Sequence, residues 1–193
     1  MKFRATAFNT YLILPALLLA SGCKSPEQKK HDKTLATFRV FLEAPADSRP
    51  PPQSLQGVLG GNAVVEIAGA SIVVNNTPLL DESMVEKAMI METQDGGFAL
   101  QIILDSHGKL MLESVTTANP NRHLGILSRW GVDKQVTQRW LAAPMISAPI
   151  SEGVLIFTPN TTREEADQIV LGLSNVVKKR KKESALFDLG TGS

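Results

Sequence analysis

Alternating apolar and polar residues predict the first strands of this chain. In TFRVFLEA, Phe38, Val40 and Leu42 alternate with polar or smaller neighbours, which is typical of a half-buried strand. Residues 63–74, AVVEIAGASIVV, are rich in Val and Ile and predict one or two short strands. Between these segments, residues 45–61 contain four prolines and three glycines, so we expect a loop there.

Helical periodicity follows in three segments. A brief helix is expected to begin near Asp81, and a longer one after Asp105, with Asn119-Pro120 as its stop signal. Thr162 and Glu165 have the Thr-x-x-Glu spacing of a capping box, which opens the third helix. The expected apolar stripes are Leu80, Met84 and Ala88; Met111, Val115 and Ala118; and Ala166, Ile169, Val170, Leu173 and Val177.

A hairpin and three further strand candidates complete the pattern. Asp95-Gly96 joins the strands MIMET and FALQIIL and allows the positive φ angles that a tight turn needs. Residues 131–138, GVDKQVTQ, are polar and are expected to interrupt the strand before them. The further strand candidates are residues 123–130, 139–146 and 153–157. Strands mixed with helices, without a repeated Gly-rich βα unit, indicate an α+β fold with two main helices on one face of an antiparallel sheet.

Cys23, the only cysteine, follows a segment with the order of a secretory signal. Lys2 and Arg4 precede an apolar run at 11–20, which is shorter than the roughly 20 residues of a membrane-spanning helix. The sequence ASGC resembles the bacterial lipobox, which implies cleavage before the cysteine and acyl chains such as palmitate on Cys23. Lys24, in place of an aspartate, favours the outer membrane. The alternative is an ordinary secreted chain with an incidental cysteine.

The chain thus divides into four parts. We expect a signal peptide at 1–22, a flexible tether at 23–35, one domain at 36–177 and a basic tail at 178–193. The tail has five consecutive cations and a Gly/Ser end, which is typical of a solvated, disordered segment. The alternative interpretation of this run is contact with phospholipid head groups or nucleic acid.

The overall charge argues against a nucleic-acid-binding protein. The chain has 20 Lys and Arg residues against 19 Asp and Glu, and loss of Lys2 and Arg4 with the signal peptide leaves 18 basic residues. A mature chain so close to neutral lacks the basic excess that binding to nucleic acid or to an anionic membrane requires. Without a second cysteine for a disulfide, stability has to come from an apolar core.

Candidate catalytic and metal-binding groups are sparse. His31, His107 and His123 are not spaced as a metal pair, and no nucleophile-elbow, zinc-protease or phosphate-loop motif occurs. Glu164 and Glu165 are adjacent on a helix, and capping explains them better than acid/base chemistry. We therefore expect no catalytic residue, no metal and no cofactor; an envelope hydrolase using His107 or His123 is the enzymatic alternative.

The segment from Arg129 to Ile150 is the candidate binding region. Trp130 and Trp140 flank the polar stretch and could stack on a ligand, or could pack against the core at the base of a hairpin. Pro144 and Pro149 limit ladder hydrogen bonds, which favours a strand end or a sheet edge where an extended peptide could dock. The candidate binding residues are Arg129, Trp130, Arg139, Trp140, Pro144 and Met145.

The order of features from Val73 to Leu173 resembles the head subdomain of the first periplasmic domain of SecD, in the SecDF protein-export family. The upstream segment NTPLLDESMVEKAMIMET is similar to the entry segment of that family. In place of the short turn after the Leu-x-Ile strand, this chain has the longer SRWGVDKQVTQRW. The matching residues are Asp105, Gly108, Asn121, Arg122, Leu124, Ile126, Ala143, Pro144, Ile146, Ile150, Gly153, Phe157, Thr158, Glu164, Glu165 and Ala166.

This resemblance implies a ferredoxin-like α+β head that transiently contacts polypeptides on the outer side of the membrane. It carries over no catalytic residue, and the transmembrane helices of the family have no counterpart here. Two non-enzymatic hypotheses follow. The first is a lipid-tethered, periplasm-facing module that binds translocating polypeptides or translocon components. The second is a structural or assembly lipoprotein that binds one folded envelope partner.

Overall fold

The computed structural model describes residues 33–45, 63–67 and 70–190. The expected signal peptide, Cys23, most of the tether and nearly all of the loop at 45–61 lie outside these residues. The described elements are β1 (Leu35–Leu42), β2 (Ala63–Ile67), β3 (Ala70–Val74), the 3-10 helix η2 (Glu82–Met84), β4 (Val85–Glu92), β5 (Phe98–Leu104), α2 (Ser106–Ala118), β6 (Leu124–Val132), β7 (Gln135–Ala142), β8 (Val154–Phe157) and α3 (Arg163–Gly190).

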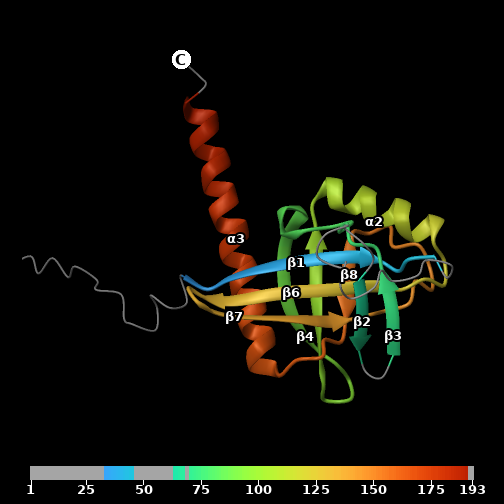
Figure 1. Cartoon of the computed structure of the whole chain (residues 1–193). Coiled ribbons are helices and arrows are strands. Elements are labelled where there is room, and N and C mark those ends of the chain that lie inside the picture. Colours follow the sequence, from blue (N-terminus) through green and yellow to red (C-terminus); the bar gives the residue numbers. More distant parts are fainter. Residues whose placement is uncertain (1–32, 46–62, 68–69, 191–193) are drawn as a thin grey trace, which may run out of the picture.

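The strands of the described segments form three antiparallel sheets, with the orders β1-β6-β7, β2-β3 and β4-β5-β8 (Figure 1). This confirms the α+β class. It differs from the expected single sheet with both helices on one face, because consecutive strands pair as the local hairpins β2-β3, β4-β5 and β6-β7, and these belong to separate sheets. α3 packs against β1, β4 and β6, whereas α2 packs against β5.

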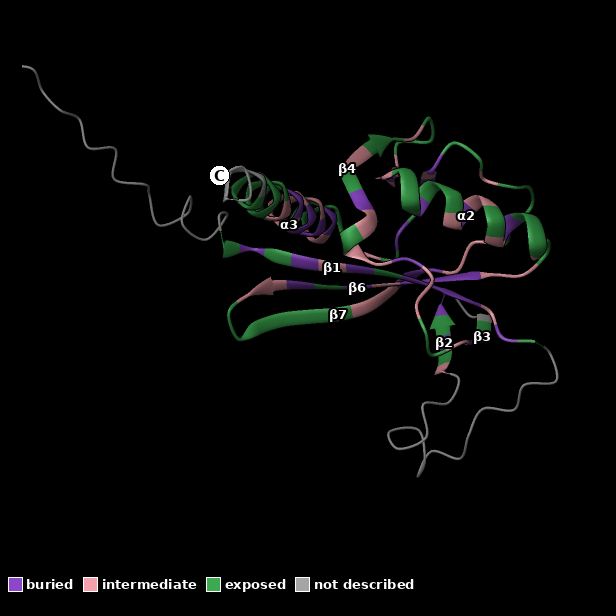
Figure 2. Ribbon diagram, turned by 90° about the horizontal axis from the view of Figure 1, so that it is seen from above, coloured by how far each residue is buried: buried purple, intermediate pink, exposed green. Residues whose placement is uncertain are grey.

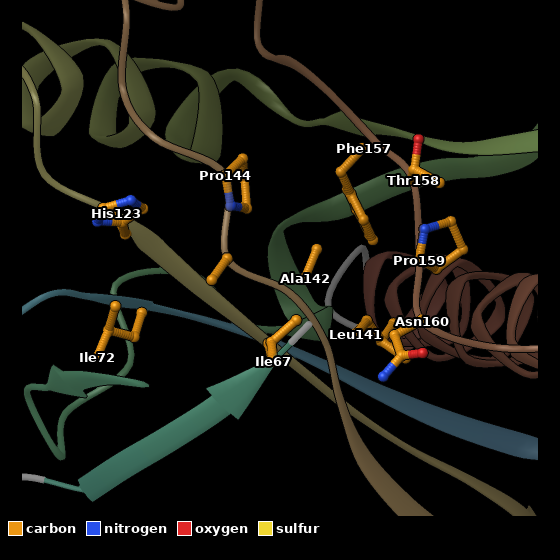
Figure 3. Close-up of a pocket in the computed structure, with 11 residues that line it drawn as sticks. Ile67, Ile72, His123, Leu141, Ala142, Pro144, Phe157, Thr158, Pro159 and Asn160 are labelled. Atoms are coloured by element: carbon orange, nitrogen blue, oxygen red, sulfur yellow. The ribbon is translucent and has the colours of Figure 1, made fainter. Parts of the chain in front are cut away.

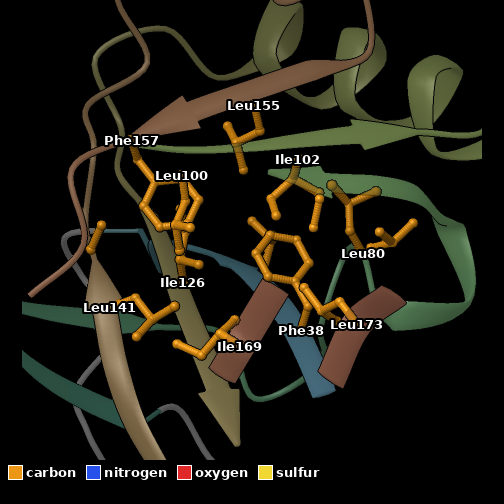
Figure 4. Packing of buried hydrophobic residues seen from close by; sticks show 14 of the residues in the cluster. Phe38, Leu80, Leu100, Ile102, Ile126, Leu141, Leu155, Phe157, Ile169 and Leu173 are labelled. Atoms are coloured by element: carbon orange, nitrogen blue, oxygen red, sulfur yellow. The ribbon is translucent and has the colours of Figure 1, made fainter. Parts of the chain in front are cut away.

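Both faces of the sheet β1-β6-β7 carry buried apolar residues. On one face, Phe38 and Ile126 enter the main core with β4-β5-β8 and α3, where the Phe38 and Phe157 rings stack at 6.4 Å between centroids (Figure 4). On the other face, Phe41 enters a second cluster with β2 and β3, which lie on the side opposite α3 (Figure 2). Because Phe41 packs there, β1 is more fully buried than a half-buried strand.

The prediction of a helix near Asp81 is wrong, because the structure has only one 3-10 turn there. The Asp81 side chain caps this turn by accepting the Ser83 N–H at 2.8 Å, and the chain then enters β4 at Val85. A register shift between Val85 and Lys87 interrupts the strand alternation, so Val85 and Ala88 are both buried. Their three-residue spacing, which comes from a β-bulge, imitates the period of a helix.

The expected interruption at 131–138 is also wrong. β6 continues to Val132, a turn at Asp133 and Lys134 follows, and β7 starts at Gln135. Asp133 has a left-handed φ of 51°. The residues from Gln135 to Gln138 are polar or exposed because this half of β7 lies at the edge of its sheet, and not because the strand stops.

α2 and the start of α3 agree with the sequence, but the tail does not. α2 ends at Ala118 as expected, although its buried face is Gly108, Leu112 and Thr116 and Ala118 is exposed. α3 continues through the basic run to Gly190, so the described part of the expected disordered tail is helical. Arg180 helps to explain this, because its guanidinium donates to the Val85 carbonyl at 2.7 Å and to the carbonyls of η2.

Candidate functional site

A groove of about 1010 Å³ lies between the first half of β7 and the first turns of α3. We call it the β7–α3 groove. Gln135, Val136 and Thr137 form one wall, and the α3 residues that form the other include Glu164, Asp167 and Leu171. The groove therefore joins an exposed strand edge to the side of a helix.

β7 is an edge strand, with β6 as its hydrogen-bonded neighbour in the sheet order. From Gln135 to Gln138 its side chains are exposed, and Val136 is an exposed apolar residue among them. Backbone N–H and C=O groups on the outer edge of such a strand can pair with an added extended chain, while a neighbouring groove accommodates its side chains. This arrangement can bind a polypeptide without bond chemistry.

The helical wall of the groove is acidic. Glu164 and Asp167 lie on it, and Lys134 lines the groove from the β6–β7 turn. Hydrogen bonds with its own backbone and with Thr162 lower the pKa of Glu164, so this carboxylate is charged at neutral pH. The groove thus presents more negative than positive charge to a bound chain.

A second hollow, of about 520 Å³, lies beside the C-terminal ends of β7 and β8 (Figure 3). Leu141, Pro144 and Phe157 give it apolar walls, and Ile67 and Ile72 of the β2-β3 hairpin complete them. A hollow of this kind suits an apolar side chain of a partner.

His123, on the rim of this hollow, is held by Glu43. The Glu43 carboxylate accepts the His123 backbone N–H at 2.7 Å and contacts the imidazole Nδ1 at 2.8 Å. Burial raises the pKa of Glu43, but its hydrogen bonds with His123 and the charges of His123 and Arg122 outweigh this effect, so the pKa is lowered. With these contacts within the domain, His123 serves to join the segments after β1 and before β6.

Two of the six candidate binding residues form an internal stack. Trp130 is only 2% exposed, in the main core, and the Arg139 guanidinium lies 5.9 Å from its ring centroid. Arg139 also donates two hydrogen bonds to the Glu165 carboxylate, at 2.8 and 3.0 Å. Both side chains thus hold β6, β7 and α3 together.

The other four candidates are scattered over the domain. Trp140 lies in the second cluster, edge-on to Phe41 with 5.4 Å between ring centroids, so the two tryptophans are on opposite faces of the sheet. Arg129 is exposed and borders a separate hollow. Pro144 lines the hollow of Figure 3, and Met145 is 55% exposed beside it. The structure therefore does not bring the six residues into one site.

Sequence reasoning missed the β7–α3 groove. The alternation at Gln135-Val136-Thr137 was a signal for a strand, but its polar composition favoured a loop. The opposite wall could not be found from spacing, because Asp167 follows Val136 by 31 residues. The capping box predicted at Thr162 and Glu165 is confirmed, at 3.0 and 3.2 Å, whereas the position of Glu164 in the groove wall was not foreseen.

The motif residues quoted above have structural roles. The Asp105 carboxylate caps α2 by accepting the Gly108 N–H at 2.9 Å, and a Cβ on Gly108 would meet the Cβ atoms of Leu104 and Met84 at 3.0 Å. Gly153 has a φ of 68° and lies against Lys109. These residues specify a fold, not a reaction. In the same described part, His, Asp and Glu side chains form no group of three that could hold a metal ion.

Comparisons with known proteins find a matching family model and solved structures with a similar fold. A family model described as the SecDF P1 head subdomain matches residues 60–175. A comparison with curated proteins finds no match. A solved structure described as a membrane component SecDF that enhances protein export is 18% identical, with a TM-score of 0.53, and the match covers 80% of this chain and 70% of that chain. A crystal structure of SecDF in a super-membrane-facing form is also 18% identical, with a TM-score of 0.51, covering 79% of this chain and 21% of that one. Within the residues that the structure describes, neither helix is long and apolar enough to cross a membrane.

Proposed function

The chain belongs to the SecDF P1 head subdomain family, and from this we propose that it is a non-catalytic protein-binding module of the bacterial cell envelope that assists protein export. The similar solved structure is described as a component that enhances protein export, which motivates the export role. The structural roles of the motif residues support a domain whose work is binding.

The open edge of β7 beside the β7–α3 groove is the observation that carries this proposal. An extended segment of an exported polypeptide adds to β7 between Gln135 and Gln138, and its side chains lie against α3. Arg129, Pro144 and Met145, which lie outside the groove, are proposed as separate secondary contacts. Trp130 and Trp140 support the sheet from its two hydrophobic clusters, and Arg139 ties β7 to Glu165 of α3.

We further propose that the domain faces the periplasm and is anchored through lipid on Cys23, with the outer membrane favoured. The lipobox-like ASGC sequence supports this anchor. A single acyl chain gives marginal membrane binding, so the two or three chains of a lipoprotein are needed for stable attachment. The ferredoxin-like topology that the family resemblance implies for this domain is also part of the proposal.

Site-specific photocrosslinking in intact cells tests the binding role. A photoreactive residue at Val136, in the groove, is compared with one at Leu110, an exposed apolar position on α2 that is 65% exposed. We expect Val136 to crosslink to many exported polypeptides or to translocon components, and Leu110 not to. Equal crosslinking from the two positions would refute the proposal that the groove binds polypeptides. A single stoichiometric partner from Val136 would instead support the assembly lipoprotein.

The anchor is tested separately by mass spectrometry of the mature N-terminus and by detergent partitioning. The wild-type chain is expected to begin at an acylated Cys23 and to partition into detergent. Cys23→Ser is expected to abolish acylation and the cleavage before residue 23, so that the variant keeps its signal peptide. An unmodified Cys23 in the wild-type chain would refute the anchor without affecting the crosslinking result.

A further inference from the structure

The last turns of α3 project from the body of the domain. After Val177, which is buried, the side chains of residues 181–187 are all exposed, as are Lys178 and Lys179. Figure 1 shows this end of the helix standing clear of the three sheets. At about 1.5 Å per residue, residues 178–187 extend roughly 15 Å beyond the packed part.

This projecting end concentrates positive charge that the overall composition conceals. Lys178, Lys179, Lys181 and Lys182 are exposed, and Glu183 faces Lys179 at 4.0 Å on the surface. Arg180 differs from them, because its guanidinium bonds the carbonyls at and after η2. The near-neutral chain therefore carries a local cationic segment.

Helical spacing places an exposed leucine beside the lysines. Lys178, Lys182 and Leu186 follow one another at four-residue intervals and so lie along one side of the helix. Leu186 is 60% exposed. Exposed lysines clustered in this way attract an anionic lipid surface, by about 1 kcal/mol for each lysine near it.

The tether leaves the domain beside this helix. The Asn175 side chain donates to the Thr34 backbone carbonyl at 2.9 Å, two residues before Val177. The chain between Cys23 and Thr34 can span at most about 35–40 Å when fully extended. A membrane that holds Cys23 is therefore within reach of both ends of α3, including the end from which the lysines project.

From this juxtaposition we propose that residues 178–187 of α3 bind anionic phospholipid head groups of the membrane that carries the anchor. The position of this membrane rests on the proposed function, but the affinity of the helix for anionic lipid does not. Two contacts, the lipid on Cys23 and the end of α3, fix how the domain stands on the membrane. The β7–α3 groove is lined by Thr34 and by the first turns of α3, so it is a separate surface from the proposed lipid contact.

Vesicle sedimentation tests the proposal with the mature chain, residues 23–193, produced without the signal peptide and carrying Cys23→Ser, which cannot be acylated. Vesicles of phosphatidylcholine alone are compared with vesicles that also contain phosphatidylglycerol. The test variant is Lys178→Gln/Lys181→Gln/Lys182→Gln. The control variant, Arg39→Gln/Lys87→Gln/Lys109→Gln, removes the same number of exposed charges elsewhere. Circular dichroism melting verifies that both variants are folded.

We expect binding to the anionic vesicles that falls with added salt, that weakens by about tenfold or more in the test variant and that persists in the control variant. Equal binding to neutral vesicles, or equal loss in the two variants, would overturn the proposal. Tighter binding to a single-stranded oligonucleotide than to the anionic vesicles would overturn it in favour of nucleic acid. An unacylated Cys23, or the absence of crosslinked partners at Val136, would count against the proposed function. Neither result would count against the binding of α3 to anionic lipid.

Discussion

Arg139 of β7 donates hydrogen bonds to both oxygens of the Glu165 carboxylate on the first turn of α3, at 2.8 and 3.0 Å. The same carboxylate accepts the Thr162 N–H at 3.0 Å in the capping box. One side chain therefore both starts the helix and ties it to the strand on the other side of the β7–α3 groove. The separation of the two groove walls depends on this contact.

We predict a measurable coupling energy between Arg139 and Glu165. In a double-mutant cycle with Arg139→Gln and Glu165→Gln, the free energies of unfolding should reveal a coupling of about 1 kcal/mol, since the pair is bidentate and partly buried. The control pair is Lys179 and Glu183, which meet at 4.0 Å on the exposed part of α3 and should show no measurable coupling. Additive effects at Arg139 and Glu165 would contradict the prediction.

The two tryptophans are predicted to differ in their effect on stability. Trp130→Ala should lower the free energy of unfolding by about 3–5 kcal/mol, because it empties a fully packed position of the main core. Trp140→Ala should cost less, because Trp140 is half-buried against the smaller cluster around Phe41. Urea denaturation of each variant measures both values. A stable, folded Trp130→Ala variant that binds partners weakly would instead revive the ligand-stacking interpretation of this residue.

Gly172 is predicted to be indispensable where α3 crosses β1. A Cβ at this position would lie 2.6 Å from the Ala36 backbone nitrogen and 2.7 Å from the Ala36 Cβ. Gly172→Ala should therefore destabilise the domain by about 1–3 kcal/mol, even though alanine favours an isolated helix by about 1 kcal/mol. Lys178→Ala, on the exposed part of the same helix, is the control and should change stability little. Thermal unfolding that shifts equally in both variants would show that the close approach is not limiting.

Stability should fall in acid through Glu43. Its pKa in the folded protein lies below the usual value of 4.5, so ionised Glu43 contributes stability above that pH. This contribution is lost as the pH falls through the folded-state pKa, when the contacts with His123 and Arg122 lose the carboxylate charge. Glu43→Gln should therefore be less stable near neutral pH and should lose less stability on acidification. Urea titrations at several pH values measure this, and parallel curves for the two proteins would contradict it.

Local patterns sufficed for the elements whose burial is regular. The stripe from Ala166 to Val177 and the capping box at Thr162 located α3, and the alternation around Phe38 located β1. The β4 bulge defeated the same reasoning, because it buries Val85 and Ala88 at a helical interval. Composition likewise could not show that Arg180 bonds distant carbonyls, one of the contacts that keep the basic run helical.

The candidate site was less accessible to sequence reasoning than the fold. Its two walls, around Val136 and Asp167, meet only through tertiary packing, so no local spacing records them. Trp130 and Arg139 were singled out as contact residues because they are conspicuous in a polar stretch. Their partners, the main core and Glu165, are set by the pairing of β6 with β7 and by the position of α3.

β1 is the first strand after the tether, and its position has a mechanical consequence. Eight register pairs join it to β6, from Leu35 opposite Gly131 to Leu42 opposite Leu124, while α3 lies against it at Gly172. A force that pulls the N-terminal end of β1 along the strand loads its pairing with β6 in shear. The hydrogen bonds then resist together and do not open one by one. The N-terminal end of the described domain is thus mechanically resistant to a force directed along the strand.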